Sequence, residues 1–247
     1  MSIPNGSDPY YQDELVTLYH GDCREVLAGM TDQSVDAVIT DPPYTERTHS
    51  KARSRSHKVN GRDVINQGVT TFAAIDDQEL RAVLADLGRV TRSWVVATLD
   101  YRHAFEFDAD PPAGLKVQRV GVWMKTRPTP QITGDRPAQG WEAIAYMHRA
   151  KGRSVWNGGG HHGNYYLDIE QKAGHPTAKP LPMVQDMIRK FTNRGDTVLD
   201  PFAGSGTTLR AAVNEGRKAI GVELEERYCE IIAKRMDQYA LDFGGVQ

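Results

Sequence analysis

The chain has 247 residues, a formal net charge of −2 and two cysteines. This length suits one large α/β domain with a substantial core, or two small domains, and no Pro/Gly/Ser-rich linker divides it. A net charge near zero provides no global field for nucleic acid, so any such contact has to come from local basic clusters. Cys23 and Cys229 fit neither a disulfide framework nor a metal site, and no apolar run reaches membrane-spanning length. We therefore expect a cytoplasmic protein of one domain, residues 1–247, with no metal and no membrane contact.

Short apolar runs alternate with helical patterns along the chain, which indicates a mostly parallel sheet with helices on both faces. The predicted strands are, in chain order, residues 15–20, 35–39, 94–99, 116–125, 141–148, 197–199 and 219–224. Only a short loop containing Pro and Gly separates residues 116–125 from 141–148. These two segments are therefore predicted to form an antiparallel pair at one edge of the sheet.

Apolar side chains recur at helical spacing in three segments and predict helix faces that pack on the core. The stripes are Leu80, Val83, Leu84 and Leu87, then Val184, Met187, Ile188 and Phe191, and finally Tyr228, Ile231, Ile232, Met236 and Tyr239.

The tetrapeptide Asp41-Pro42-Pro43-Tyr44 follows directly on the second predicted strand. The two prolines fix φ and remove two backbone donors, so a carboxylate and an aromatic ring are held in a stiff turn with free carbonyls. At the carboxyl end of a strand, where ligands of open α/β folds bind, this arrangement suits a flat ring with an amino group. An Asp-Pro turn that merely ends a buried strand is the alternative.

A second motif runs from a short strand through the turn Asp200-Pro201-Phe202-Ala203-Gly204-Ser205-Gly206-Thr207 into a helix. Gly204 and Gly206 allow a tight turn and close approach of a ligand to the backbone. Leu209 stands where a dinucleotide fingerprint needs its third glycine, and the Gly-Lys-Ser/Thr of a P-loop is absent. The next predicted strand carries Glu223 at its end, a position at which an acid typically binds ribose hydroxyls. Together these features favour an adenosine ligand.

These residues resemble the S-adenosylmethionine-dependent DNA methyltransferases that modify adenine N6 or cytosine N4. The similarity rests on Asp41 to Tyr44, on Asp200 to Thr208, and on His175-Pro176-Thr177-Ala178-Lys179-Pro180. It extends to Gly21-Asp22-Cys23, Trp123-Met124-Lys125 and Glu142. Because the catalytic motif precedes the cofactor loop, the order resembles the permuted β class. The resemblance implies a single catalytic domain with a Rossmann-like methyltransferase fold.

The resemblance also implies roles for individual residues. Asp41 and the Pro42 carbonyl would accept the two hydrogens of the target amino group, Pro43 would stiffen the turn, and Tyr44 would stack on a flipped base. The residues expected to bind S-adenosyl-L-methionine are Asp22, Cys23, Thr177, Lys179, Asp200, Phe202, Ala203, Gly204, Ser205, Gly206, Thr207 and Glu223. Asp22 is equally suited to cap the helix predicted after it, and both uses can coexist.

Residues 45–69 have no clear counterpart in that family and form a basic, polar segment after the tetrapeptide. Its candidate DNA-binding side chains are Arg47, Lys51, Arg53, Arg55 and Lys58. Beside the mouth of the site, such a loop could order on DNA phosphates, and a loop that is only mobile surface is the alternative.

Residues 151–174 mix basic, aromatic and glycine residues where the resembled family places sequence recognition. This segment is a candidate for recognition of a short DNA target, with structural packing of Trp156, Tyr165 and Tyr166 as the alternative. His161 and His162 lack the further ligands that a metal site needs.

An Asp at the first position of the tetrapeptide goes mostly with adenine in this family, so adenine N6 in double-stranded DNA is the expected target. Cytosine N4, an RNA base, and a non-catalytic nucleic-acid-binding subunit are the alternatives. Members of the family often form dimers, and the edge strands would offer a surface for a homodimer.

Overall fold

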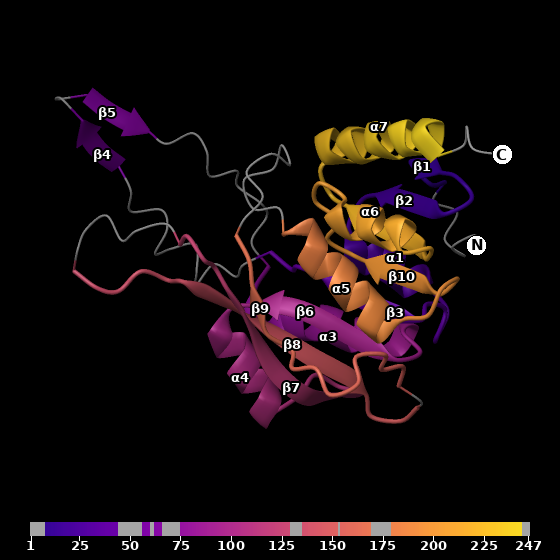
Figure 1. The fold of residues 1–247 in the computed structure, drawn as a ribbon, viewed down its shortest axis with the longest axis horizontal. Helices are drawn as coiled ribbons and strands as arrows, with labels where there is room; N and C mark the ends of the chain where they lie inside the picture. Colours follow the sequence, from indigo (N-terminus) through magenta and orange to yellow (C-terminus); the bar gives the residue numbers. More distant parts are fainter. Residues whose placement is uncertain are drawn as a thin grey trace.

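The computed structural model describes residues 8–43, 56–59, 62–65, 75–128, 135–152, 154–168 and 179–243, without the side chains of 56–59, 62–65 and 239–243. A nine-stranded sheet in the order β1-β2-β11-β10-β3-β6-β8-β7-β9 runs through it (Figure 1). Its strands are β1 Tyr11–Gln12, β2 Val16–His20, β3 Ala37–Thr40, β6 Trp94–Leu99, β7 Leu115–Met124, β8 Trp141–Arg149, β9 Tyr165–Tyr166, β10 Thr197–Asp200 and β11 Lys218–Glu223.

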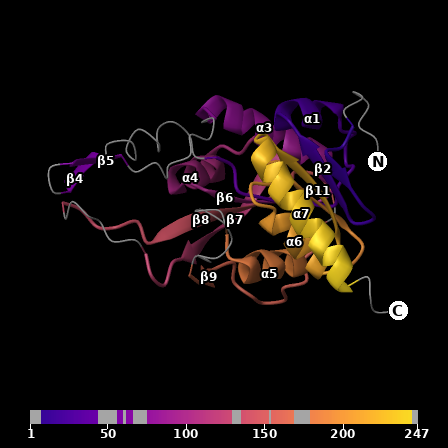
Figure 2. The same cartoon turned by 90° about the horizontal axis from the view of Figure 1, so that it is seen from above.

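Helices cover both faces of this sheet (Figure 2). One core contains buried side chains of α1, α3 and α4, and the other contains those of α5, α6 and α7. The helices are α1 Cys23–Gly29, α3 Asp77–Val90, α4 Tyr101–Ala109, α5 Leu181–Phe191, α6 Thr207–Asn214 and α7 Glu226–Phe243. Because side chains alternate along each strand, every central strand contributes to both cores. In β3, for example, Ile39 faces one core and Val38 the other.

The predicted mostly parallel sheet is confirmed. Strands β2, β11, β10, β3 and β6 run parallel, whereas β8 is antiparallel to both of its neighbours, β6 and β7. The prediction that β7 and β8 form the edge needs correction, because the two-residue strand β9 pairs in parallel with β7 and lies outside it. The other edge is the short β1, which is antiparallel to β2.

The seven predicted strands are all present, with ends that differ from the prediction by at most two residues. The first two helical stripes are buried in α3 and α5, as expected, and Tyr228, Ile232 and Met236 are buried in α7. Ile231 is only partly buried. Within the described ranges, no helix is both long and apolar enough to span a membrane.

The basic segment of residues 45–69 contains two short strands that were not predicted. Strands β4 Ser56–Val59 and β5 Arg62–Ile65 pair antiparallel and form a second, two-stranded sheet. Lys58 lies in β4, opposite Asp63. The alternation of polar and apolar residues in β4 and β5 is too short, and too interrupted by charge, to have predicted this hairpin.

The adjacency of β3 and β10 positions the two sequence motifs. Val198 pairs with Ala37 and Leu199 with Val38, although some 160 residues separate them in the chain. Asp36 fixes this register at the amino ends, since its carboxylate accepts the Thr197 amide at 2.8 Å and its own amide donates to the Thr197 carbonyl at 2.9 Å. The two strands are parallel, so the turns that follow them lie together at the carboxyl ends of the strands.

Candidate active site

The turns that follow β3 and β10 lie side by side at the carboxyl edge of the sheet. The hydroxyl of Thr40, the last residue of β3, donates to the buried Asp200 carboxylate at 2.7 Å. Asp41 comes next in the chain after Thr40, and Phe202 donates its amide to the same Asp200 oxygen at 3.1 Å. The neighbourhood expected from the sequence is therefore present for Asp41, Pro42 and Pro43. Tyr44 lies outside the described residues.

Asp200 connects the two turns from a fully buried position. Burial raises the pKa of its carboxyl group to about 6, because hydrogen bonds from Thr208, Thr40 and the Phe202 amide only partly offset the loss of solvent. The negative charge of Asp41 raises this pKa further. Asp200 is thus a buried carboxyl group that joins the two turns by hydrogen bonds, and its expected contact with the cofactor stays a prediction.

The glycine turn has the backbone geometry that the sequence predicted. Gly204 and Gly206 have φ of +53° and +81°, values that residues with a side chain rarely adopt. A Cβ on Gly206 would lie 2.9 Å from the Ile232 side chain, whereas a Cβ on Gly204 would meet only the Phe202 carbonyl at 3.9 Å. The face over Gly204 is thus open to a ligand. Of the other turn residues, Ala203 and Ser205 are buried, Phe202 is partly buried, and Thr207 begins α6.

Glu223 ends β11 and holds the glycine turn from the neighbouring strand. Its carboxylate accepts the Gly204 amide at 2.7 Å and the Glu225 amide at 2.8 Å. Burial raises the pKa of Glu223, and the two amides work against that rise. A carboxylate oxygen can accept two hydrogen bonds, so each oxygen has capacity for a ligand hydroxyl. An ionised carboxylate only accepts hydrogen bonds, and the buried Glu223 therefore suits a pair of ribose hydroxyls, which donate them.

The segment after β2 lies next to Glu223, since the Gly21 amide donates to the Glu223 carbonyl at 2.9 Å. Asp22 is the N-cap of α1, as predicted, and accepts the Arg24 amide at 2.9 Å. The hydrogen bond from the Arg24 side chain also lowers the pKa of Asp22. Cys23 is buried, which raises the pKa of its thiol to about 12. Cys23 is therefore a neutral, largely buried thiol in the first turn of α1.

Asp41 is held at both carboxylate oxygens. The Thr98 hydroxyl donates to Oδ1 at 2.5 Å, and the Lys179 ammonium donates to Oδ2. The same ammonium lies 3.3 Å from Oε2 of Glu142, and Lys125 Nζ lies 2.6 Å from Oε1 of Glu142. The resemblance assigned Lys179 to the cofactor, and its ammonium group contacts Asp41 and Glu142 here.

This network lies against the buried ring of Trp123. Lys125 Nζ is 5.2 Å and Lys179 Nζ is 5.8 Å from the centre of that ring. Burial would by itself raise the pKa of Glu142, but the charges of Lys179 and Lys125 outweigh it and lower that pKa. Glu142 is thus an anion between two cations. The resemblance covered Trp123, Lys125 and Glu142 without giving them a role, and Thr98 carried no signal in the sequence at all.

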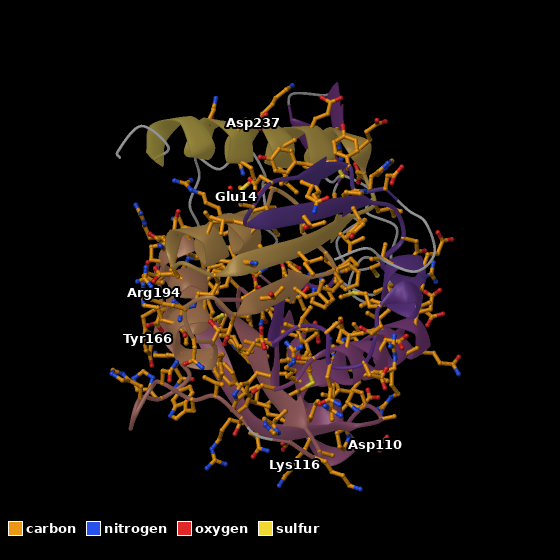
Figure 3. The ribbon with its side chains drawn as sticks, turned by 90° about the vertical axis from the view of Figure 1, so that its right-hand side faces the viewer. Glu14, Asp110, Lys116, Tyr166, Arg194 and Asp237 are labelled. Carbon is orange, nitrogen blue, oxygen red and sulfur yellow. The ribbon has the colours of Figure 1, made fainter. Side chains whose placement is uncertain are left out.

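The candidate recognition segment packs closely where it is described. Asn157 donates from its side chain to the Thr192 carbonyl at 2.9 Å, at the end of α5, and Tyr165 donates to Asp186 of α5 at 2.9 Å. The Trp156 ring lies 5.2 Å from that of Phe191. These contacts favour the structural alternative for Trp156 and Tyr165. Tyr166, 62% exposed, lies at the outer margin of the molecule (Figure 3).

Several expected site residues lie outside the described part of the chain, and their roles stay predictions. They are Thr177 of the predicted cofactor set and Arg47, Lys51, Arg53 and Arg55 of the basic segment, while Lys58 is described only by its backbone.

Comparisons with known proteins identify the family and the fold. The DNA methylase family of N6 and N4 methyltransferases matches residues 35–234. The type II methyltransferase M.HinfI of Haemophilus influenzae is 28% identical over 253 residues, which cover 91% of this chain and 69% of that enzyme. The crystal structure of the M1.HpyAVI–SAM complex is 25% identical with a TM-score of 0.66, and the match covers 90% of this chain and all of that one.

The fold is also that of the cytosine-N4-specific PvuII DNA methyltransferase, with a TM-score of 0.70 at 16% identity over 93% of this chain and 89% of that one. The α/β sheet with helices on both faces is thus a Rossmann-like methyltransferase fold. Because the family match spans most of the chain and includes both turns of the site, the chain belongs to the N6/N4 DNA methylase family.

Proposed function

We propose that this DNA methyltransferase moves a methyl group from S-adenosylmethionine to the exocyclic N6 of adenine. One observation carries the proposal: the carboxylate of Asp41 and the glycine turn of residues 203–206 follow neighbouring parallel strands and are joined through Thr40 and Asp200. An acceptor for an amino group and a turn suited to the cofactor therefore share one edge of the sheet.

The residues of the glycine turn and its surroundings fit S-adenosylmethionine. The open face over Gly204 admits the cofactor close to the backbone, and Glu223 offers acceptors to its ribose hydroxyls. Phe202, Asp22 and Cys23 would border the rest of the ligand. When bound, the cofactor supplies an electrophilic methyl carbon on its sulfonium.

Asp41 and Pro42 prepare the nucleophile. The lone pair of an aromatic amine is delocalised into the ring, so the nitrogen attacks poorly until its N–H bonds are drawn toward tetrahedral geometry. The Asp41 carboxylate and the Pro42 carbonyl accept these two hydrogens and stabilise the positive charge that develops on nitrogen. As the N–C bond forms and the C–S bond breaks, the sulfur keeps the electron pair. The same carboxylate is the acceptor for the proton that the methylated nitrogen sheds.

The amino group of a paired base is shielded within the duplex, so the reaction needs a flipped base. Tyr44 is the side chain proposed to stack on it. Contacts to the DNA backbone are assigned to the basic segment of residues 45–69, and target recognition to residues 151–174.

A homodimer is part of the same proposal, and light scattering of the purified protein tests it.

The choice of adenine N6 over cytosine N4 follows from Asp41 at the first position of the tetrapeptide. The fold itself accommodates either chemistry, as the likeness to a cytosine-N4-specific enzyme illustrates. Methylation of an RNA base would use the same site. A non-catalytic subunit would need neither Asp41 nor the open glycine turn, so the presence of both favours an enzyme.

The test is direct. Unmethylated duplex DNA is incubated with the protein and radiolabelled S-adenosylmethionine, then digested to nucleosides. Label in N6-methyl-2′-deoxyadenosine supports the proposal, whereas label in N4-methyl-2′-deoxycytidine would identify cytosine N4 as the target in place of adenine N6. No label in DNA, together with no binding of S-adenosylmethionine by calorimetry, would overturn the proposed activity.

A further inference from the structure

We infer that Thr98, Lys179 and Glu142 are positioning residues for the Asp41 carboxylate. Thr98 holds one oxygen of Asp41, Lys179 holds the other, and Glu142 balances Lys179. This inference rests on the proposed role of Asp41 as the acceptor for the target amino group. It assigns to Lys179 a function different from cofactor binding.

Thr98 reaches Asp41 because of strand pairing. Thr40 pairs with Ala97 across β3 and β6, so Thr98 stands beside Asp41 at the next position of the two strands. The Thr98 side chain is buried, and a buried hydroxyl that donates to a carboxylate makes a short, strong hydrogen bond. Its β-branched side chain has little rotational freedom in a strand. Thr98 therefore holds Asp41 in one rotamer.

Lys179 is enclosed by two carboxylates. Its side chain is 10% exposed, and its ammonium contacts Asp41 Oδ2 and lies 3.3 Å from Glu142 Oε2. A cofactor carboxylate would be a third anion at one ammonium. The positive charge of Lys179 is already paired with the carboxylates of Asp41 and Glu142. These contacts therefore favour a role for Lys179 in positioning Asp41.

The negative charge of Glu142 weakens the electrostatic attraction between Lys179 and Asp41. Lys125 holds its Oε1 at 2.6 Å, which leaves Oε2 facing Lys179. The formal charges of Asp41, Lys179, Glu142 and Lys125 sum to zero, so each charge at this largely buried site has a partner of opposite sign. Without the Glu142 charge, Lys179 would pair more strongly with Asp41 and weaken it as an acceptor for the substrate.

The first experiment removes the hydroxyl without changing the shape of the side chain. Thr98→Val should lower kcat by about tenfold or more, because a hydrogen bond to a charged group is lost, and should leave the Kd for S-adenosylmethionine within about twofold. Thr98→Ser should restore most of kcat. Thr91→Val is the matched control. Thr91 is a fully buried threonine whose hydroxyl donates to the Asp36 carbonyl, at the amino ends of the strands and therefore far from Asp41.

A crystal structure of ligand-free Thr98→Val gives a readout other than activity, and Asp41 should leave its rotamer there. A kcat for Thr98→Val equal to that of the wild type, a loss matched by Thr91→Val, or a loss that Thr98→Ser does not restore would each overturn the role of Thr98.

The second experiment separates the two assignments of Lys179. Lys179→Met should lower kcat at saturating cofactor and leave the calorimetric Kd for S-adenosylmethionine unchanged, and Glu142→Gln should do the same. Lys190→Met is the control, because Lys190 is also a largely buried lysine paired with a carboxylate, Asp186, at 2.6 Å. A weaker Kd with unchanged kcat for Lys179→Met would return Lys179 to the cofactor and overturn the inference.

The proposed function can fail separately from this inference. A wild-type protein that transfers no methyl group to DNA would overturn both. An active wild type that is inactivated by Asp41→Ala, but unaffected by Thr98→Val and Lys179→Met, would overturn only the positioning role.

Discussion

The buried carboxyl group of Asp200 makes a quantitative prediction about stability and pH. Replacement by Asn keeps an oxygen for the Thr40 hydroxyl and the Phe202 amide, which Oδ1 now accepts at 2.7 Å and 3.1 Å. The change removes the ionisable group and replaces the second oxygen by an amide nitrogen, so the hydrogen bond from Thr208 changes as well, with an effect that does not depend on pH. Asp200→Asn should therefore become progressively more stable relative to the wild type as the pH rises.

The magnitude follows from the difference in proton affinity between the folded and unfolded states. The pKa of Asp200 is about 6 in the folded protein, against an ordinary value of 3.8. The unfolded chain thus loses this proton first, so the contribution of Asp200 to stability is complete below pH 3.8 and is lost as the pH rises through about 6. Over this interval the contribution of Asp200 to the free energy of unfolding falls by about 3 kcal/mol, because a difference of one pKa unit is worth about 1.4 kcal/mol.

The assay is urea denaturation of both proteins at intervals between pH 4 and pH 8. The difference in free energy of unfolding, variant minus wild type, should grow by about 2.5 kcal/mol over that range, because the unfolded chain has already begun to lose its proton at pH 4, and contributions of unchanged groups cancel in the difference. Asp186→Asn is the control: burial opposes Lys190 and Tyr165, but these two prevail and lower the pKa of Asp186 below its ordinary value of 3.8, so its difference in free energy of unfolding should stay nearly flat between pH 4 and pH 8. A difference for Asp200→Asn that does not vary with pH would refute the account of a desolvated carboxyl group.

Three further outcomes are expected. Gly206→Ala should lower the free energy of unfolding by at least about 1 kcal/mol more than Gly114→Ala in urea denaturation, since both glycines have positive φ but only the first would clash. Equal losses would contradict the close packing under the turn. Asp41→Ala should bind S-adenosylmethionine in calorimetry as the wild type does and lose transfer by about 100-fold or more, so retained transfer would remove Asp41 from the chemistry. Replacing Arg53 and Arg55 by Ala should reduce the slope of log affinity for DNA against log salt by up to about 2, and an unchanged slope would dismiss them as phosphate contacts.

Local patterns predicted most of the fold. Alternation and apolar runs located the central strands, and the spacing of Leu80, Val83, Leu84 and Leu87 located α3. The glycine turn was also predictable, because Gly204 and Gly206 are the residues that positive φ requires. Short elements such as β1 and β9 were missed, since two residues carry no periodicity.

The surroundings of Asp41 depend on contacts between distant parts of the chain. Thr98 is an ordinary residue of an apolar strand, and only the pairing of β3 with β6 brings it to Asp41. Lys179 was assigned to the cofactor by its place in a motif, and only the fold brings Asp41 and Glu142, a residue of β8, to its ammonium group. A sequence motif predicts which residues have a role, whereas the tertiary fold determines which group each of them contacts.

A crystal structure of the protein with S-adenosylmethionine bound would show whether Asp41 faces the methyl group of the cofactor. The cofactor should lie against the glycine turn, with its methyl carbon within about 6 Å of an Asp41 carboxylate oxygen, a distance that one amino group placed between them would span. A cofactor whose methyl carbon points away from Asp41, with no room for an amino group between them, would contradict this prediction.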